Sequence, residues 1–134
     1  MFVYYHFGKH NDDIKKITWR KLVYMMEQIK EINVLNERLK NDVYVFLKHS
    51  STCGISASAF DQFLSFVNDN QRVHTGYLIV QEDRELSNVI AELFEVKHES
   101  PQLLIFQKGR LKWHISHAGI RKETIEEQLL YLAD

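Results

Sequence analysis

Short apolar runs along the chain predict buried strands. Residues 43–47 (Val-Tyr-Val-Phe-Leu) and 77–80 (Tyr-Leu-Ile-Val) have no charged interruption, which is typical of strands covered on both faces. Residues 103–106 and 111–115 flank a short connection that contains Gly109. They predict an antiparallel hairpin, because glycine suits a turn that needs positive φ. Apolar and polar residues alternate over the second of these segments, so we expect a half-exposed strand at the sheet edge.

The segment before the first buried strand is expected to be helical. Apolar residues recur at helical spacing from Trp19 to about Asn33, or on through Leu39. The residues that precede it mix aromatic side chains with a polar cluster and show no firm period. We therefore expect an N-terminal extension, 1–18, that forms an extra strand or a tail, and one domain, 19–134.

Three further amphipathic stretches predict helices between and after the strands. The first covers residues 59–67 and ends at a cluster of turn-forming residues. The second, residues 86–94, carries apolar residues at i, i+3, i+4, i+7 and i+8. The last is expected to begin near Thr124, because Thr124-Ile-Glu-Glu127 is a capping-box pattern.

The order of these elements indicates an α/β fold. Strands joined by helices come first, and a hairpin completes the sheet before the last helix. This order fits a thioredoxin-like fold, with a central mixed sheet of about four strands and helices on both faces.

The composition is that of one ordinary globular domain. Of 134 residues, 45% are hydrophobic, and 17 Lys plus Arg stand against 18 Asp plus Glu, a formal net charge of −1. Without a basic field we expect no nucleic-acid partner. The N-terminus lacks the features of a signal peptide, and no apolar stretch approaches the length of a membrane span. We therefore expect a cytoplasmic protein without a membrane partner, and its oligomeric state stays open.

Cys53 is the single cysteine, so an internal disulfide is excluded. It lies between a buried strand and the helix that follows, where Thr52 can cap the helix while the thiol occupies the first turn. Free backbone N–H groups and the helix dipole favour a thiolate there. A nucleophile therefore fits this position better than a buried structural cysteine. Lys48 and His49 are expected to add positive charge if their side chains reach the sulfur.

Ser56 stands three residues after Cys53, where a dithiol oxidoreductase has its second cysteine. A single thiol cannot release a mixed-disulfide partner from within. Its product is therefore linked through sulfur to a small thiol, which a second thiol molecule releases. Ser56 can still donate a hydrogen bond to the thiolate.

Pro101 is the single proline and directly precedes the segment 103–106. Thioredoxin-like folds hold a cis-proline at this place, so we expect a cis bond between Ser100 and Pro101. The preceding backbone would then turn toward the sulfur and pair with an extended substrate chain.

Taken together, these residues resemble the YtxJ-type monothiol bacilliredoxins of bacillithiol-using bacteria. The matching segments are residues 46–50, 52–56, 86–87, 98–102, 113–114 and 116–117. The resemblance implies that Cys53 removes bacillithiol from mixed disulfides on oxidised proteins by taking the adduct onto itself. Bacillithiol carries a malate, so Lys48, His49 and His98 are expected to bind this anion, beside Ser100, Pro101 and Gln102.

Gly54 departs from this family, whose members usually read Thr-Cys-Pro-Ile-Ser. Proline would pre-set the first helical turn, and glycine leaves it looser. The segment Cys53-Gly-Ile-Ser56 is also similar to the Cys-Gly-Phe-Ser of monothiol glutaredoxins, which hold an iron–sulfur cluster between two subunits. The paired glycines that bind glutathione in that family have no match here. A non-catalytic binding module on the same scaffold is the other alternative.

The seven histidines do not form a standard zinc motif. His114 with His117, and His49 with Cys53, are conceivable ligand pairs, but each lacks further ligands at a recognisable spacing. We therefore expect no metal site and no bound cofactor, with bacillithiol as a co-substrate. An iron–sulfur cluster belongs to the glutaredoxin alternative alone.

Overall fold

The computed structural model describes residues 2–6, 14–18, 26–52 and 54–133. Strand β1 (Phe2–His6) pairs antiparallel with β2 (Ile14–Thr18), and the two form a sheet of their own. The N-terminal extension therefore contains two strands paired with each other, where one added strand or a tail was expected.

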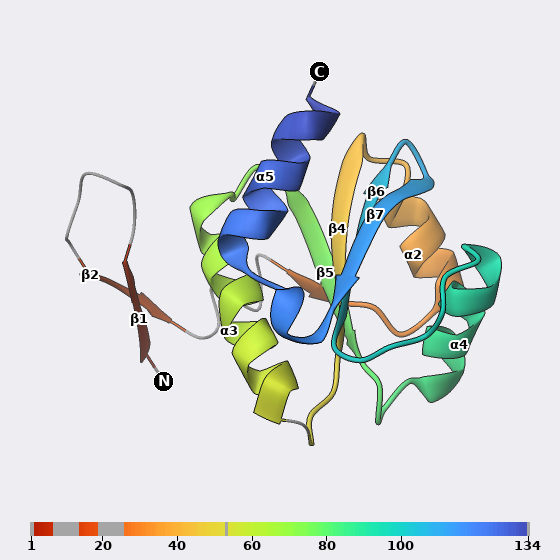
Figure 1. Cartoon of the computed structure of the whole chain (residues 1–134), viewed down its shortest axis with the longest axis horizontal. Coiled ribbons are helices and arrows are strands. Elements are labelled where there is room, and N and C mark those ends of the chain that lie inside the picture. The colour runs from red at the N-terminus through yellow and green to blue at the C-terminus, as the bar shows by residue number, and fades with distance from the viewer. Residues whose placement is uncertain (1, 7–13, 19–25, 53, 134) are drawn as a thin grey trace.

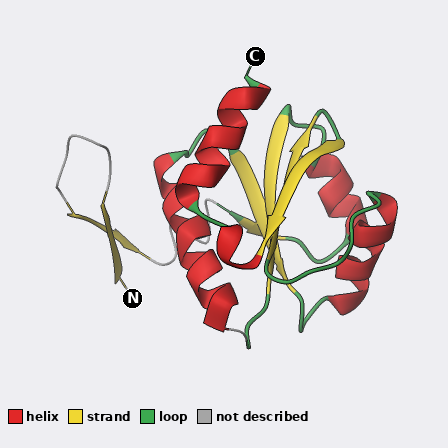
Figure 2. Ribbon diagram, in the orientation of Figure 1, coloured by secondary structure: helices red, strands yellow, loops and turns green. Residues whose placement is uncertain are grey.

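A five-stranded mixed sheet forms the centre of the domain, one strand more than expected (Figures 1 and 2). Its order is β3-β5-β4-β6-β7, in which β3 and β4 run parallel to β5, and β6 and β7 complete the sheet antiparallel. The strands are β3 (Glu27–Gln28), β4 (Val43–His49), β5 (His74–Ile79), β6 (Gln102–Gln107) and β7 (Arg110–Ser116).

Helices cover both faces of this sheet, as predicted. Figure 1 shows α3 and α5 on one face and α2 and α4 on the other. Their bounds are α2 (Ile32–Arg38), α3 (Gly54–Asp69), α4 (Arg84–Leu93) and α5 (Lys122–Leu132), with a short 3-10 helix η1 (His117–Gly119) before α5.

Strand β4 divides the hydrophobic core into two layers. Val45 and Leu47 pack with Phe63 of α3, whereas Phe46 packs with Ile90 of α4 on the opposite face. All five side chains are buried. This alternation explains why the segment has no charged interruption in its middle, and the prediction of a strand buried on both faces is confirmed.

The β6–β7 hairpin is also confirmed. Gly109 has a φ of 79°, a conformation that glycine adopts without steric cost. Strand β7 is the sheet edge, and its residues alternate as expected, with Lys112 and His114 exposed and Trp113 partly buried.

The predicted first helix is wrong over residues 26–31, whereas its continuation toward Leu39 agrees with α2. Where a helix from Trp19 was expected, the chain forms the short strand β3, and α2 begins only after it; residues 19–25 lie outside the described residues. The Ile29 N–H donates to the Tyr77 carbonyl at 2.8 Å, and Met26 and Ile29 are both buried. Pairing with β5 buries these apolar residues without a helix, so tertiary pairing overrides the local helical spacing.

The expected capping box before the last helix is wrong as well. Helix α5 begins at Lys122, and its cap residue Arg121 makes no side-chain capping hydrogen bond. The backbone N–H of Lys122 instead donates to Gln62 Oε1 of α3 at 2.9 Å. A neighbouring helix thus satisfies an N–H group that a local cap would otherwise have to satisfy.

Candidate active site

The candidate site lies at the edge of the sheet where β4 and β5 end. The connection 50–53 leads from β4 to α3, and the connection 80–83 leads from β5 to α4; both lie at the lower edge in Figure 1. Loops at the carboxyl ends of parallel strands commonly form binding sites in α/β folds. Cys53 falls in the first connection but outside the described residues, so the site is built from its neighbours.

Helix α3 begins at Gly54, the residue that follows Cys53. Because residue 53 lies outside the described residues, capping by Thr52 stays a prediction. The Thr52 hydroxyl lies 3.1 Å from Gln81 Nε2, which donates to it. A Cβ placed on Gly54 would meet no atom within 4 Å, so packing does not require glycine at this first turn.

Gln81 holds the three residues that precede Cys53. Its Oε1 accepts from the Ser51 N–H at 2.9 Å and from the Ser51 hydroxyl at 3.2 Å. Its Nε2 donates to the Ser50 hydroxyl at 2.7 Å and to Thr52. One side-chain amide thus ties the connection 50–52 to the turn after β5. Sequence reasoning missed Gln81; its place one residue after a buried apolar run was the available signal.

Ser56 and His49 form a second contact behind this connection. The buried Ser56 Oγ accepts from the Ser50 N–H at 2.8 Å and lies 3.1 Å from His49 Nδ1. When Nδ1 is the acceptor, Ser56 donates its single hydrogen to the imidazole and keeps none for a thiolate. The expected hydrogen bond to the thiolate therefore depends on the His49 tautomer.

The surroundings of His49 disfavour a positive charge on its ring. Its ring packs against Phe60 with centroids 4.5 Å apart, and burial lowers the pKa of His49 below the ordinary 6.5. Burial therefore favours the neutral imidazole, and a positive charge on His49 beside the sulfur stays a prediction.

Lys48 faces the other side of the sheet. Its side chain is 0% exposed, its Nζ donates to the Ser87 carbonyl at 3.0 Å, and His98 Nδ1 lies 3.4 Å away. Burial lowers the pKa of Lys48 to about 8, so the amine is still mostly protonated at pH 7. Lys48 and His49 are adjacent in the chain and were expected to act together, but only Lys48 lies next to His98.

His98 connects Lys48 to the surface. Ser87 Oγ lies 2.9 Å from His98 Nδ1, and Arg84 Nη1 lies 3.3 Å from His98 Nε2. Burial, followed by the charges of Lys48 and Arg84, lowers the pKa of His98. The structure therefore places Arg84, which the sequence analysis did not identify, beside Lys48 and His98, which it did.

The Ser100–Pro101 peptide bond is cis, the isomer expected from the sequence. The Pro101 carbonyl accepts from the His117 N–H at 3.0 Å. Gln102 is buried, and its Nε2 donates to the Lys97 carbonyl at 3.0 Å. Gln102 thus holds the loop before β6 from inside, whereas Ser100 is partly exposed at its outer surface.

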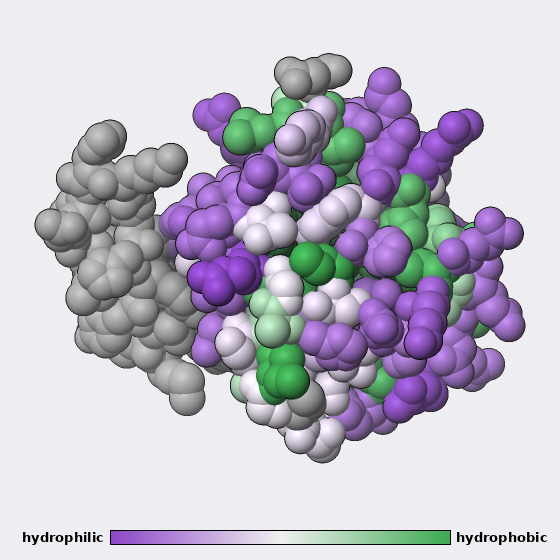
Figure 3. Space-filling model, viewed as in Figure 1, coloured by the Kyte–Doolittle hydropathy of each residue, from purple (hydrophilic) through white to green (hydrophobic). Residues whose placement is uncertain are grey.

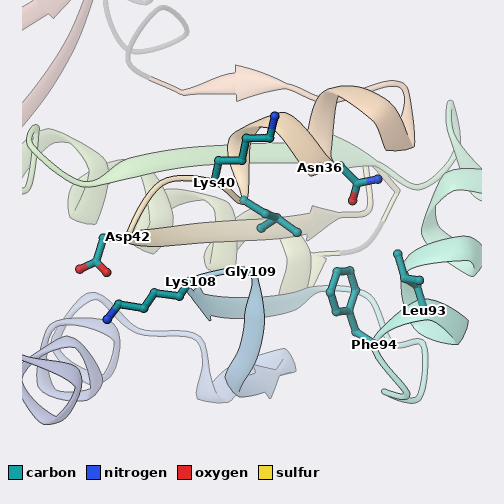
Figure 4. Close-up of a pocket in the computed structure, with 8 residues that line it drawn as sticks. Asn36, Lys40, Asp42, Leu93, Phe94, Lys108 and Gly109 are labelled. Carbon is teal, nitrogen blue, oxygen red and sulfur yellow. The ribbon is translucent and has the colours of Figure 1, made fainter.

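A cavity of about 720 Å³ lies at the opposite end of the domain (Figure 4). Its walls include Leu39 and Asp42 before β4, Phe94 after α4, and Gly109 in the β6–β7 turn. Strand β4 spans roughly 20 Å at 3.3 Å per residue, so this cavity is remote from the connection 50–53. It is not part of the candidate site.

The outer surface shown in Figure 3 is mostly hydrophilic, with hydrophobic residues in separate places. Within the described ranges, the exposed large hydrophobic side chains are Ile55, Leu93, Leu130 and Tyr131. No helix of the described chain is long and apolar enough to cross a membrane. No cluster of three or more His, Asp or Glu side chains suited to a metal ion occurs in the same part of the chain.

Solved structures identify the fold. A protein assigned as an oxidoreductase with a thioredoxin fold is 36% identical, with a TM-score of 0.74 over 79% of this chain and 95% of that chain. Mitochondrial thioredoxin 3 of Saccharomyces cerevisiae (18% identity, TM-score 0.64, 80% and 95% covered) shares the fold. So does thioredoxin of Trypanosoma brucei brucei (13% identity, TM-score 0.66, 81% and 90% covered). The fold and the single cysteine before α3 define a thioredoxin-like thiol oxidoreductase.

The family model for the monothiol bacilliredoxin BrxC matches residues 24–125. This match spans most of the chain, and the chain belongs to that family. The resemblance drawn from the sequence motifs is thereby confirmed.

Proposed function

We propose that this protein removes bacillithiol from mixed disulfides on oxidised proteins through Cys53. The observation that supports this most is the connection 50–52, which Gln81 and Ser56 hold directly before Cys53 and the start of α3. At the N-terminus of α3, the N–H groups of the first helical turn favour the thiolate form of a single thiol. The proposal includes the cytoplasm, where thiols are kept reduced, as the place of action.

The reaction is two successive thiol–disulfide exchanges. The Cys53 thiolate attacks the bacillithiol sulfur of the mixed disulfide, the substrate S–S bond breaks, and a new S–S bond joins Cys53 to bacillithiol. The substrate protein leaves as a thiolate and takes a proton from water. A second bacillithiol then attacks the adduct, which frees Cys53 and yields the bacillithiol disulfide, so bacillithiol is the net reductant.

The neighbouring residues have distinct parts in this proposal. The backbone at Ser100 and Pro101 pairs with the extended chain of the substrate protein. Lys48 and His98 contribute to binding of the anionic small thiol, with His98 nearer the surface and Lys48 buried behind it. Thr52 and Gly54 shape the start of α3.

The test presents the reduced protein with bacillithiol-modified and glutathione-modified forms of one test protein and follows adducts by intact mass. We expect a fast adduct from the bacillithiol-modified form and none in Cys53→Ala, whose melting temperature should be nearly unchanged. Ser58→Ala is the matched control, because Ser58 is an exposed residue of the same helix.

Two results would contradict the proposal. An adduct in Cys53→Ala would exclude the assigned nucleophile. No adduct from either modified protein would exclude the activity: a brown protein would then point to the iron–sulfur alternative, and a colourless one to the binding module.

A further inference from the structure

Lys48 is a buried cation without a described counter-ion. Its side chain is fully buried, yet none of the ion pairs between described residues includes it, and burial alone lowers its pKa. A buried charge is normally paired, because its desolvation is costly. Through His98, this charge lies next to the guanidinium of Arg84, so three basic side chains converge.

Three acidic residues near this cluster, Glu82, Asp83 and Glu99, have other partners. Glu82 and Asp83 both pair with Lys30, at 3.0 and 3.4 Å. Glu99 acts on His98 through its charge, but its carboxylate is hydrogen-bonded to Ser116. None of the described ion pairs includes Arg84. The described ion pairs therefore place no carboxylate on Lys48 or Arg84.

The contacts of His98 allow two tautomers of its ring. In the first, His98 Nδ1 accepts from the Ser87 hydroxyl and from the Lys48 ammonium, which has three donors and no acceptor. The ring hydrogen then lies on Nε2, because a neutral imidazole carries one. Nε2–H faces Arg84 Nη1 at 3.3 Å, and a guanidinium has no acceptor. In this tautomer two donors face each other; in the other tautomer Nδ1–H donates to the Ser87 hydroxyl and Nε2 accepts from Arg84.

These donors lie at the same edge as the candidate active site. Arg84 follows the turn whose Gln81 holds the residues before Cys53, and His98 lies two residues before Ser100. Since the backbone at Ser100 and Pro101 is assigned to the substrate protein, the donors beside it are left for the small-thiol half of the disulfide.

We infer that His98 Nε2–H and the Arg84 guanidinium bind one carboxylate, carried by the small thiol of the mixed disulfide. This inference rests on the proposed function for its ligand, but the donor pair itself can be tested without thiol transfer. An oxyanion that bridges the two nitrogens from one side would accept from both, and it would select the tautomer in which Nδ1 accepts from Lys48 and Ser87.

The first experiment measures anion binding by the reduced full-length protein. Long-range proton–nitrogen spectra of the imidazoles are recorded during a titration with sodium succinate, against sodium chloride at equal ionic strength. We expect His98 to show the Nε2–H tautomer and a saturable shift, while the exposed His74 shifts little. Arg84→Gln should weaken the succinate affinity about tenfold or more. Arg110→Gln, an exposed arginine on β7, is the matched control.

The second experiment assigns the source of the carboxylate. One test peptide is linked by a disulfide to 3-mercaptopropionic acid or to its neutral amide, and kcat/KM is measured for each. We expect the wild type and Arg110→Gln to prefer the acid, and Arg84→Gln to lose most of that preference through KM.

Each outcome decides the inference separately from the proposed function. No saturable shift at His98, or one equally strong in Arg84→Gln, would overturn the carboxylate site even if thiol transfer is fast. A saturable shift lost in Arg84→Gln supports the site even if no disulfide is reduced. A shift without any preference for the acid disulfide would overturn the assignment to the small thiol and leave a free anion as the ligand.

Discussion

Gln81 shows how one side chain can organise a reactive segment. Its amide makes hydrogen bonds to the backbone of Ser51 and to the hydroxyl groups of Ser50, Ser51 and Thr52. These are the residues that lead directly into Cys53. Because the reactivity of a thiol depends on the N–H groups and charges around it, the position of this segment should affect the pKa of Cys53.

We expect Gln81→Met to keep the size of the side chain and remove all of these hydrogen bonds. The residue is exposed, so the free energy of unfolding should fall by only about 1 kcal/mol. The pH profile of Cys53 alkylation by iodoacetamide should shift to higher pH, and kcat/KM should fall severalfold. Gln71→Met is the control, because Gln71 makes a single local hydrogen bond, to the Asn68 carbonyl. An unchanged alkylation profile would contradict the positioning role.

At the scale of elements, β5 must accept β3 on one side and β4 on the other. Gly76 lies opposite Glu27 of β3 and Phe46 of β4. A Cβ on Gly76 would lie within 1.9 Å of Tyr44 Oη and 3.0 Å of the Glu27 carbonyl oxygen. The tyrosine hydroxyl is buried and has no hydrogen-bond partner among the described residues. Glycine is therefore required where these side chains and strands meet.

We expect Gly76→Ala to lower the free energy of unfolding by about 1–3 kcal/mol, the usual cost of overpacking. Adding Tyr44→Phe should recover part of this loss, because phenylalanine lacks the hydroxyl that the new Cβ would strike. Urea unfolding measures both variants. Gly54→Ala is the matched control and should lose no stability, since its Cβ meets no atom within 4 Å. Equal stability of Gly76→Ala and wild type would refute this account of β5.

At the scale of the whole molecule, buried basic groups couple stability to pH. Burial lowers the pKa of Lys48 from 10.5 to about 8 and lowers the pKa values of His49 and His98. In each case the unfolded chain binds protons that the folded chain has already released. The free energy of unfolding therefore rises with pH between the folded and the unfolded pKa of each group. For the two histidines, stability is lost as the pH falls below about 6.5, where the histidines of the unfolded chain become charged.

We expect the Lys48 contribution to raise the free energy of unfolding by about 2 kcal/mol between pH 7 and pH 9.5. The window stops below the ordinary pKa of tyrosine, because Tyr44 and Tyr77 have raised pKa values and act in the opposite direction at higher pH. Denaturant unfolding of Lys48→Met should lack this rise, whereas Lys112→Met, an exposed lysine of β7, should retain it. A rise of equal size in Lys48→Met would show that another group is responsible.

Local pattern was sufficient for much of the fold. Burial and period can be read from consecutive residues in the apolar runs of β4, β5 and β6 and in the apolar stripe of α4. Gly109 likewise indicates the turn between β6 and β7. The family could likewise be recognised from short motifs around Cys53 and Pro101. Strand β3 and the start of α5 could not be predicted, because pairing with β5 decides the first and a hydrogen bond from the Lys122 N–H to Gln62 Oε1 decides the second.

By itself, the sequence determined strands β4 to β7 and most helices, the single thiol, and the membership of a monothiol family. The tertiary structure alone decided that Lys48 and His49 face opposite sides of the sheet, that His98 joins Lys48 to Arg84, and that Gln81 holds the residues before Cys53. The physical reason is distance along the chain. Periodicity reports which residues are buried, but the partners of a buried polar group lie tens of residues away and are set by how the strands and helices pack.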